Sequence, residues 1–303
     1  MQLRLQRGNG YNTEYSRKNM EPQSNETTRD AHRGPVSAAH SSTHPSIHSS
    51  ISSRPILGVN LAVTDYAGVL EAVCAAVAAH TQIRLAFCNV HVTMTATEQP
   101  ALMAALNHPA ALTAPDGMPL VWAMRSWGEK IKTRVYGPDF FELCLKAPAD
   151  HGFTHFFYGS SDDTLGKLKT AVATRFPTAQ VVGAYAPPFR ALDADEEDKV
   201  ARMINDSGAT ILWVALGAPK QELWIARMAD KLQCPVLVAV GAGFDFIAGT
   251  VKQAPDWMQD HGLEWLYRLI QEPRRLWWRY CYYNPRFIAR VVWERLRNSP
   301  QRH

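Results

Sequence analysis

The sequence of 303 residues predicts an α/β domain in which a mostly parallel sheet carries helices on both faces. Two observations predict this fold class. Short apolar runs alternate with longer stretches of helical character, and the runs are apolar at consecutive positions rather than at every second one. Strands of that kind are buried on both faces, which is typical of parallel sheets covered by helices.

Five runs are expected to be strands, because they are short, apolar and rich in β-branched or aromatic residues. They are residues 83–87, 154–158, 179–184, 210–216 and 235–240. The stretches around them predict helices over 64–80, 92–107, 118–128, 161–176, 193–207 and 219–232. Thr64, Ser161 and Asp193 are expected N-caps, since their side-chain oxygens can accept a hydrogen bond from a backbone amide of the first turn. This alternation indicates a Rossmann-like sheet.

Polar and glycine-containing loops follow the expected strands directly. They contain Asn89 and residues 158–163, 183–185, 217–222 and 241–246. In open parallel sheets, ligands bind in the crevice at the carboxyl ends of the strands. We therefore expect these loops to surround one site.

The loop "GAPKQE" is the first candidate for that site. Gly217 allows the backbone to turn away from its strand, and Pro219 suits the first turn of the next helix. The start of a helix offers unpaired backbone amides to an anion. The residues presented there are Lys220, Gln221 and Glu222. A capped helix with solvated polar side chains explains the same pattern equally well.

The loop "GAGFDF" is the second candidate. It does not match G-x-G-x-x-G and lacks the expected acidic partner, which disfavours dinucleotide binding. Gly243 still permits close approach of a nucleotide or a sugar. Asp245 lies between two phenylalanines, so its carboxylate needs a partner. Helix capping and recognition of a ribose or base both remain open for Asp245.

Asp116 and Arg134 are further candidates with more than one interpretation. An Asp-Gly pair is most often a turn, and Asp116 could also cap a helix beginning near Met118. On the rim of a site, the same carboxylate could act as a general base. Arg134 could clamp a diphosphate through its planar guanidinium, or could simply pair with Asp139.

The composition divides the chain into three parts. Residues 1–54 are polar and aperiodic and are expected to be disordered, 55–260 form the α/β domain, and 261–303 form a C-terminal appendage. Five scattered cysteines, with no C-x-x-C pair, indicate reduced thiols rather than a disulfide framework or a zinc site. No apolar run is long enough to span a membrane, and the N-terminus has no secretory signal.

The C-terminal appendage is basic and aromatic. From Glu264 to His303 it holds nine arginines and three acids. This excess of six positive charges (nine minus three) is larger than the net charge of +4 of the whole chain. Pro273 and Pro285 are expected to break it into short helices. Arginines and aromatic rings favour an anionic lipid surface, so we expect the appendage to lie on a membrane and to close the site. Packing of its apolar side on the core or on another subunit is the alternative.

Several longer motifs together resemble one known family. They are "PDG" (115–117), "RVYGPDFF" (134–141), "LGAPKQELWI" (216–225), "VGAGFDFIAGTVKQAPDWM" (240–258) and "GLEWLYRLIQEPRRLWWRY" (262–280). In this order, from about Ile56 to the C-terminus, they resemble the WecG/TagA/CpsF family of bacterial glycosyltransferases. The resemblance implies an inverting transferase that uses neither a metal nor a cofactor. Such an enzyme moves a sugar from a UDP-sugar donor to an undecaprenyl-diphosphate-linked saccharide in surface or exopolysaccharide biosynthesis.

The resemblance also implies roles for single residues. Asp116 falls on the proposed general base, and Asn89, Arg134, Gln221 and Asp245 fall on positions near the nucleotide-sugar. Arg268 and Arg275, with Arg279 close by, fall on arginines that the appendage brings over the site. The implied location is the cytoplasmic face of the membrane, with self-association also compatible. The family usually has a threonine where this chain has Phe87, which leaves the donor sugar undetermined.

A function of a different class remains as the alternative. A non-catalytic nucleotide- or RNA-binding protein could use the basic aromatic appendage for stacking on bases. The glycosyltransferase interpretation, by contrast, requires no nucleic-acid partner. Replacing Asp116 discriminates between the two, because only the enzyme needs a base.

Overall fold

The computed structural model describes residues 51–298, apart from the side chains of residues 256, 260, 275, 279 and 298. Except for residues 51–54, the predicted polar tail 1–54 therefore lies outside the described residues. The described part begins with a short antiparallel hairpin of β1 (Ser53–Ile56) and β2 (Val59–Ala62). Within residues 51–298, no helix combines the length and apolar character needed to cross a membrane.

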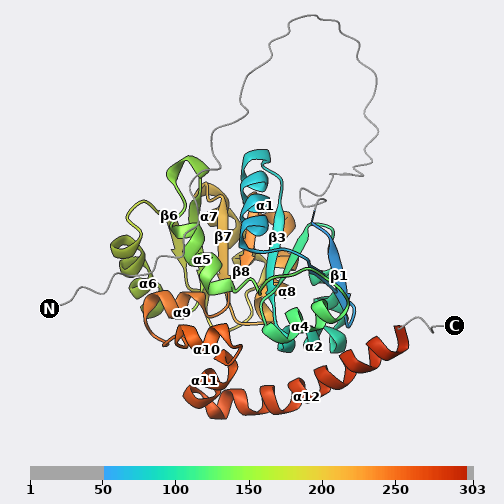
Figure 1. Ribbon diagram of the computed structural model, residues 1–303. Helices are drawn as coiled ribbons and strands as arrows, with labels where there is room; N and C mark the ends of the chain where they lie inside the picture. The colour runs from blue at the N-terminus through green and yellow to red at the C-terminus, as the bar shows by residue number, and fades with distance from the viewer. Residues whose placement is uncertain (1–50, 299–303) are drawn as a thin grey trace, which may run out of the picture. The chain divides into compact units, whose positions relative to one another are not determined.

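A sheet of six parallel strands forms the centre of the domain, in the order β4-β3-β8-β7-β5-β6 (Figure 1). The strands are β3 (Ile83–Cys88), β4 (Ala111–Pro115), β5 (Thr154–Gly159), β6 (Gln180–Tyr185), β7 (Ile211–Ala215) and β8 (Val236–Ala239). The five predicted strands and the predicted fold class are confirmed. The prediction missed β4, β1 and β2, because each is short and carries alanine, proline or polar residues in place of a continuous β-branched run.

Twelve helices accompany the strands within the described residues. The first six are α1 (Tyr66–Ala79), α2 (Val90–Glu98), α3 (Pro100–Leu106), α4 (Met118–Ser126), α5 (Gly137–Leu145) and α6 (Asp162–Arg175). The others are α7 (Ala194–Asp206), α8 (Lys220–Met228), α9 (Gly243–Ala248), α10 (Asp256–Asp260), α11 (Glu264–Gln271) and α12 (Pro273–Asn298). Short 3₁₀ turns occupy Ala149–His151 and Ala229–Lys231.

Two of the three predicted N-caps are confirmed. The Ser161 side chain accepts a hydrogen bond from the amide of Thr164. Asp193 forms a reciprocal capping box with Glu196, so these two acidic residues cap the N-terminus of α7. The prediction for Thr64 is wrong by one residue, because Asp65 caps α1 by accepting from the amide of Gly68.

Two predictions about helix breaks are also wrong. The single helix predicted over 92–107 is two helices, because Pro100 has no amide hydrogen and begins α3 as its first residue. Pro285 was expected to end a helix but lies inside the continuous helix α12. An internal proline costs roughly 3 kcal/mol. Phe287, two residues later, is buried against the α/β domain, and that packing favours continuation of the helix.

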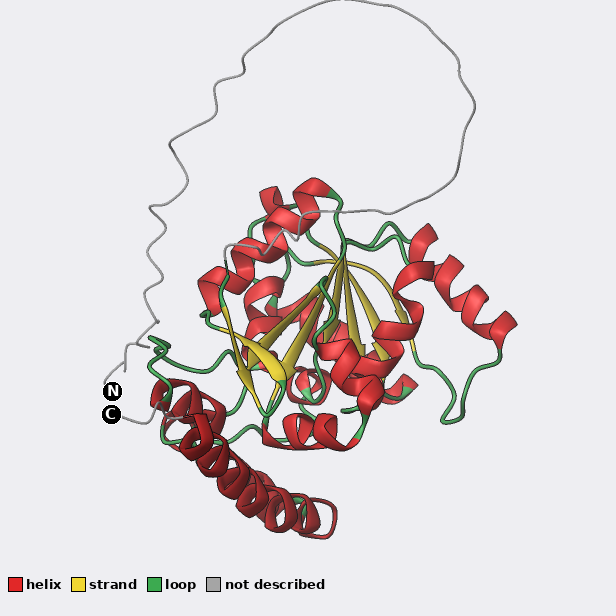
Figure 2. Ribbon diagram, turned by 90° about the vertical axis from the view of Figure 1, so that its right-hand side faces the viewer, coloured by secondary structure: helices red, strands yellow, loops and turns green. Residues whose placement is uncertain are grey.

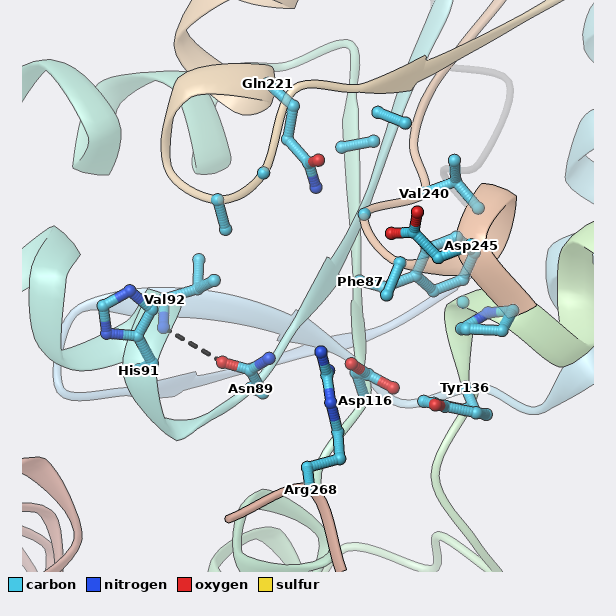
Figure 3. Close-up of a pocket in the computed structure, with 18 of the residues that line it drawn as sticks. Phe87, Asn89, His91, Val92, Asp116, Tyr136, Gln221, Val240, Asp245 and Arg268 are labelled. Carbon is cyan, nitrogen blue, oxygen red and sulfur yellow. Dashed lines mark hydrogen bonds between the residues drawn. The ribbon is translucent and has the colours of Figure 1, made fainter. Parts of the chain in front are cut away.

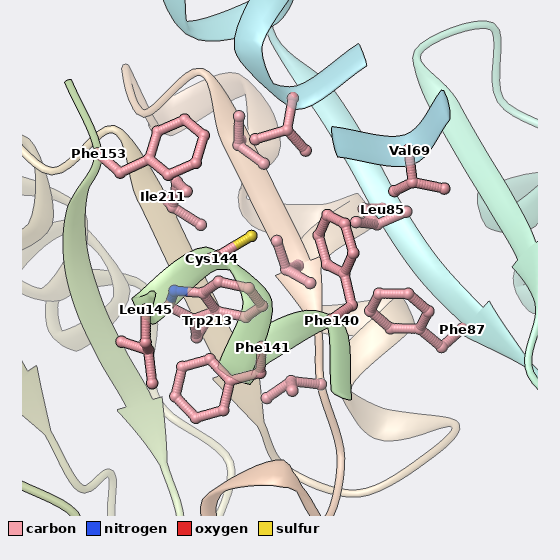
Figure 4. Close-up of a cluster of buried hydrophobic side chains, with 14 of the residues drawn as sticks. Val69, Leu85, Phe87, Phe140, Phe141, Cys144, Leu145, Phe153, Ile211 and Trp213 are labelled. Carbon is pink, nitrogen blue, oxygen red and sulfur yellow. The ribbon is translucent and has the colours of Figure 1, made fainter. Parts of the chain in front are cut away.

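Two helical layers cover the sheet, as Figure 2 shows. Helices α1, α5, α6 and α9 pack on one face around large aromatic side chains (Figure 4). Phe141 of α5 lies with its ring centroid 4.5 Å from that of Trp213 in β7, at the centre of this layer. The other face carries the hairpin with α2, α3 and α4 at one end, and α7 and α8 at the other. The two layers hold the carboxyl ends of the strands in place, where the site lies.

Candidate active site

A cavity of about 640 Å³ lies at the carboxyl ends of β3, β7 and β8. The chain leaves β3 towards α2 on one face of the sheet and leaves β8 towards α9 on the other. A crevice at such a switch point is the usual ligand site of an open parallel sheet. A smaller cavity of about 140 Å³ shares part of its lining. Five residues line both cavities: Asn89, His91, Asp116, Tyr136 and Arg268.

Asn89 is held at this shared wall by the start of α2. It follows β3 directly and is the N-cap of α2, where its Oδ1 accepts a hydrogen bond from the amide of Val92 at 3.2 Å (Figure 3). The cap leaves little rotational freedom to the side chain. Asn89 therefore presents its amide group to both cavities in a fixed orientation.

Asp116 lies directly after β4, and its backbone amide donates to the carbonyl of Cys88 at 2.7 Å. It does not cap α4, whose N-cap is Gly117 without a side-chain hydrogen bond. The Oδ1 atom of Asp116 is buried and accepts no hydrogen bond from any described residue. Burial raises the pKa of this carboxyl from 3.8 to about 7, Arg134 opposes the rise and Glu264 adds to it. A carboxyl with such a pKa can accept a proton near neutral pH.

Arg134 lines the smaller cavity rather than the larger one. Its Nη2 forms an ion pair with Oε2 of Glu264 at 2.7 Å, and its guanidinium lies 4.3 Å from the ring centroid of Tyr136. The alternative pairing with Asp139 is wrong. The carboxylate of Asp139 instead accepts hydrogen bonds from the side chains of Tyr66 and Gln253.

Three predicted residues from two separate loops meet in the larger cavity. Gly217 has a φ of 77°, a left-handed conformation that favours glycine, and directs the chain away from β7 into α8. Gln221 is buried on the first turn of α8 and faces the same space. Asp245 of α9 also lines the cavity, and its Oδ1 accepts a hydrogen bond from the Thr250 hydroxyl at 3.2 Å.

Three other predicted residues line neither of the two cavities. Lys220 is exposed on the outer side of the start of α8. Glu222 is buried beneath the loop, where its Oε1 accepts from Nε2 of Gln221 at 3.0 Å. Gly243 is required for packing, because a Cβ there would lie 2.6 Å from a methyl group of Val240. Glu222 and Gly243 thus support the loops from below.

The C-terminal appendage contributes to both cavities. Arg268 of α11 points towards Asn89 and Asp116 (Figure 3). Helix α12 adds Leu276, Trp278 and Tyr283 to the larger cavity. Arg275 and Arg279 lie on α12, but their side chains are outside the described residues. Of the three arginines that the resemblance implies, Arg268 is the one whose side chain is described, and it lies in the site.

The sequence did not single out several lining residues. His91 lines both cavities, and the centroid of its ring lies 5.2 Å from that of Tyr283. Tyr136 lies inside a quoted motif, and Ser160 lies in the loop after β5 with a φ of 62°. Phe87, which the sequence did single out in place of the family threonine, also lines the larger cavity and packs beneath Gly137, where a Cβ would lie 2.8 Å from its ring.

Comparison with known proteins agrees with the resemblance. A profile of the "Glycosyl transferase WecG/TagA/CpsF family" matches residues 54–301. The chain belongs to this family of glycosyl transferases. Two similar proteins each carry the name N-acetylglucosaminyldiphosphoundecaprenol N-acetyl-beta-D-mannosaminyltransferase. The one from Bacillus spizizenii is 29% identical over 204 residues, which are 67% of this chain and 76% of that protein. The one from Bacillus subtilis is 29% identical over 180 residues, which are 59% of this chain and 68% of that protein.

Proposed function

We propose that this chain transfers a sugar from a UDP-sugar to a saccharide linked to undecaprenyl diphosphate, with inversion and with Asp116 as the general base. The observation that carries the proposal is the position of Asp116 at the wall between two cavities. Membership of the family and the names of the two relatives support a lipid-linked acceptor.

In this proposal the two cavities receive the two substrates. The larger one has the volume for a nucleotide-sugar, and Gln221 and Asp245 supply polar groups that can recognise it. The smaller one receives the sugar of the acceptor, whose hydroxyl then lies beside Asp116. Phe87 lines the larger cavity, so it is the residue that we expect to influence the choice of donor sugar.

The reaction then needs one displacement. Asp116 takes the proton of the acceptor hydroxyl while the oxygen attacks the anomeric carbon of the donor from the opposite side. The bond from that carbon to the diphosphate breaks, and UDP leaves. Negative charge grows on the diphosphate during this step, and Arg268 lines the space where it can be stabilised.

The lipid-linked acceptor requires the enzyme to work at a membrane surface. Helix α12 exposes a row of apolar side chains, with Trp277, Trp278, Ile288, Val292, Trp293 and Leu296 all at least half exposed. Arginines share this helix with them. An amphipathic helix of that composition binds the headgroup region of anionic membranes. We infer that α12 associates with the cytoplasmic face of the membrane and holds the site near its substrate.

Transfer assays with Asp116→Asn test the proposal. A panel of UDP-sugars is assayed with short-chain polyprenyl-diphosphate sugar acceptors, and UDP affinity is measured by calorimetry. Removal of the base should lower the transfer rate by about 10²- to 10⁴-fold while UDP affinity stays within about twofold. Full turnover by the variant would refute the assignment of the base. UDP binding without transfer by the unaltered chain would favour the non-catalytic nucleotide-binding alternative.

A further inference from the structure

One acidic residue of the C-terminal appendage is buried inside the catalytic domain. Glu264 is the first residue of α11, and only 7% of its surface is exposed. Its Oε2 lies 2.7 Å from Nη2 of Arg134, and its Oε1 accepts a hydrogen bond from the Tyr136 hydroxyl. Burial of a carboxylate costs free energy unless the carboxylate is paired, and even a buried ion pair often adds little stability. The position of Glu264 therefore suggests a role other than stabilising the fold.

The same guanidinium also reaches Asp116. Nη1 of Arg134 lies 3.5 Å from the main-chain oxygen of Asp116, while the other terminal nitrogen, Nη2, makes the pair with Glu264. The buried Oδ1 of Asp116 accepts no hydrogen bond from any described residue. Without Glu264, Arg134 would lose its ion-pair partner while the carboxylate of Asp116 remained nearby. An ion pair between Arg134 and Asp116 would hold the proton acceptor in an unreactive contact.

We propose that Glu264 is a positioning residue: by binding the Arg134 guanidinium, it keeps that cation off the Asp116 carboxylate and leaves the carboxylate available as a base. This inference rests on the proposed function. Glu264 belongs to the appendage, so the base is prepared only while α11 is seated on the catalytic domain. The electrostatic directions agree, because Arg134 lowers the pKa of Asp116 and Glu264 raises it.

Several other ionisable groups lie around Asp116 and are retained in a Glu264 variant. The charged ones are Arg268 from α11 and Asp139 from α5. The remaining groups are Tyr136 at the start of α5, His91 from α2, Cys88 from β3 and Tyr66 from α1. The charge of Glu264 itself also raises the pKa of Asp116, so a second variant must separate this direct effect from the release of Arg134.

The test is a Glu264→Gln variant, which removes the charge but keeps the size of the side chain. The protein is labelled with carboxyl-¹³C aspartate, the Asp116 resonance is assigned by its loss in Asp116→Asn, and both proteins are titrated without substrate. In Glu264→Gln the pKa of Asp116 should fall by about one unit or more, because the negative charge of Glu264 is lost and Arg134 is released towards the carboxylate. The pH dependence of kcat/KM for transfer should shift in the same direction, and kcat should fall about tenfold or more.

A matched control and a double variant isolate the cause. Glu294 also fixes the appendage to the domain, since its carboxylate accepts from the amide of Leu57, but it lies away from the two cavities. Glu294→Gln should leave the titration of Asp116 unchanged. Arg134→Gln should raise the pKa of Asp116 more in the Glu264→Gln background than in the unaltered chain, because only without Glu264 does the cation lie against the carboxylate. Equal effects in the two backgrounds would overturn the inference.

The outcomes separate this inference from the proposed function. An unchanged titration of Asp116 in a folded Glu264→Gln protein would overturn the inference, as would an equal shift in Glu294→Gln. The titration needs no substrate, so it can succeed even if the unaltered chain transfers no sugar. Failure of transfer with a shifted titration would refute the proposed function alone.

Discussion

Replacing Asp116 by asparagine should make the protein more stable at alkaline pH while removing its activity. Burial raises the pKa of this carboxyl from 3.8 to about 7, so the native state binds the proton more tightly than the unfolded chain does. Between the pKa of the unfolded chain and that of the native state, the free energy of unfolding therefore falls as the pH rises. Asparagine cannot ionise, and the variant avoids this loss.

The magnitude follows from the difference between the two pKa values. A difference of about 3 corresponds to about 4 kcal/mol, since each pKa unit is worth roughly 1.4 kcal/mol. At pH 8 the full difference applies, whereas at pH 5 less than about 2 kcal/mol remains, because Asp116 is then largely protonated in the native state. The gain in stability of Asp116→Asn should therefore grow by about 2–3 kcal/mol between pH 5 and pH 8.

Urea denaturation of both proteins at pH 5 and pH 8 measures this gain. Asp206→Asn is a suitable control, because Asp206 is an exposed carboxylate at the end of α7. Surface changes of that kind usually alter the free energy of unfolding by less than about 0.5 kcal/mol. The reasoning is refuted if Asp116→Asn shows no gain at pH 8, or if its gain is the same at both pH values.

Two further predictions concern packing and membrane binding. Gly243→Ala should lower the free energy of unfolding by about 1–3 kcal/mol, because its Cβ overlaps a neighbouring side chain. Gly166→Ala, which meets nothing within 4 Å inside α6, should instead raise it by up to about 1 kcal/mol, and equal effects in thermal melts would contradict the packing argument. The double variant Trp277→Gln/Trp293→Gln should sediment less with anionic vesicles than the unaltered chain. Phe189→Gln, at a residue 95% exposed outside the appendage, should sediment normally, and an equal loss in both would place the membrane contact elsewhere.

The sequence predicted the sheet well, because buried parallel strands carry a strong apolar signal. The runs of β7 and β8 are entirely buried, and no competing pattern obscures them. Strand β4 gave a weaker signal, since alanine, threonine and proline occupy four of its five positions. Its pairing with β3 places Asp116 beside Asn89. That proximity depends on the order of the strands in the sheet, which the sequence around each strand does not reveal.

The candidate site was predicted in part. Asn89, Gly217, Gln221 and Asp245 could be found because each follows a strand end, and the loops after parallel strands converge. The contribution of Tyr136 could not be found, because it depends on how the segment before α5 crosses the sheet. The partner of Arg134 was also beyond prediction. It comes from α11, which is 130 residues later in the chain and is placed only by tertiary packing.

The pH dependence of kcat/KM for sugar transfer tests the central claim most directly, because it reports the ionisation of the free enzyme. If Asp116 accepts the proton, the value should rise about tenfold per pH unit in the acid range and level off near pH 7. The residual activity of Asp116→Asn should lack this dependence. A profile of the unaltered chain that stays level from pH 5 to pH 8 would contradict the claim.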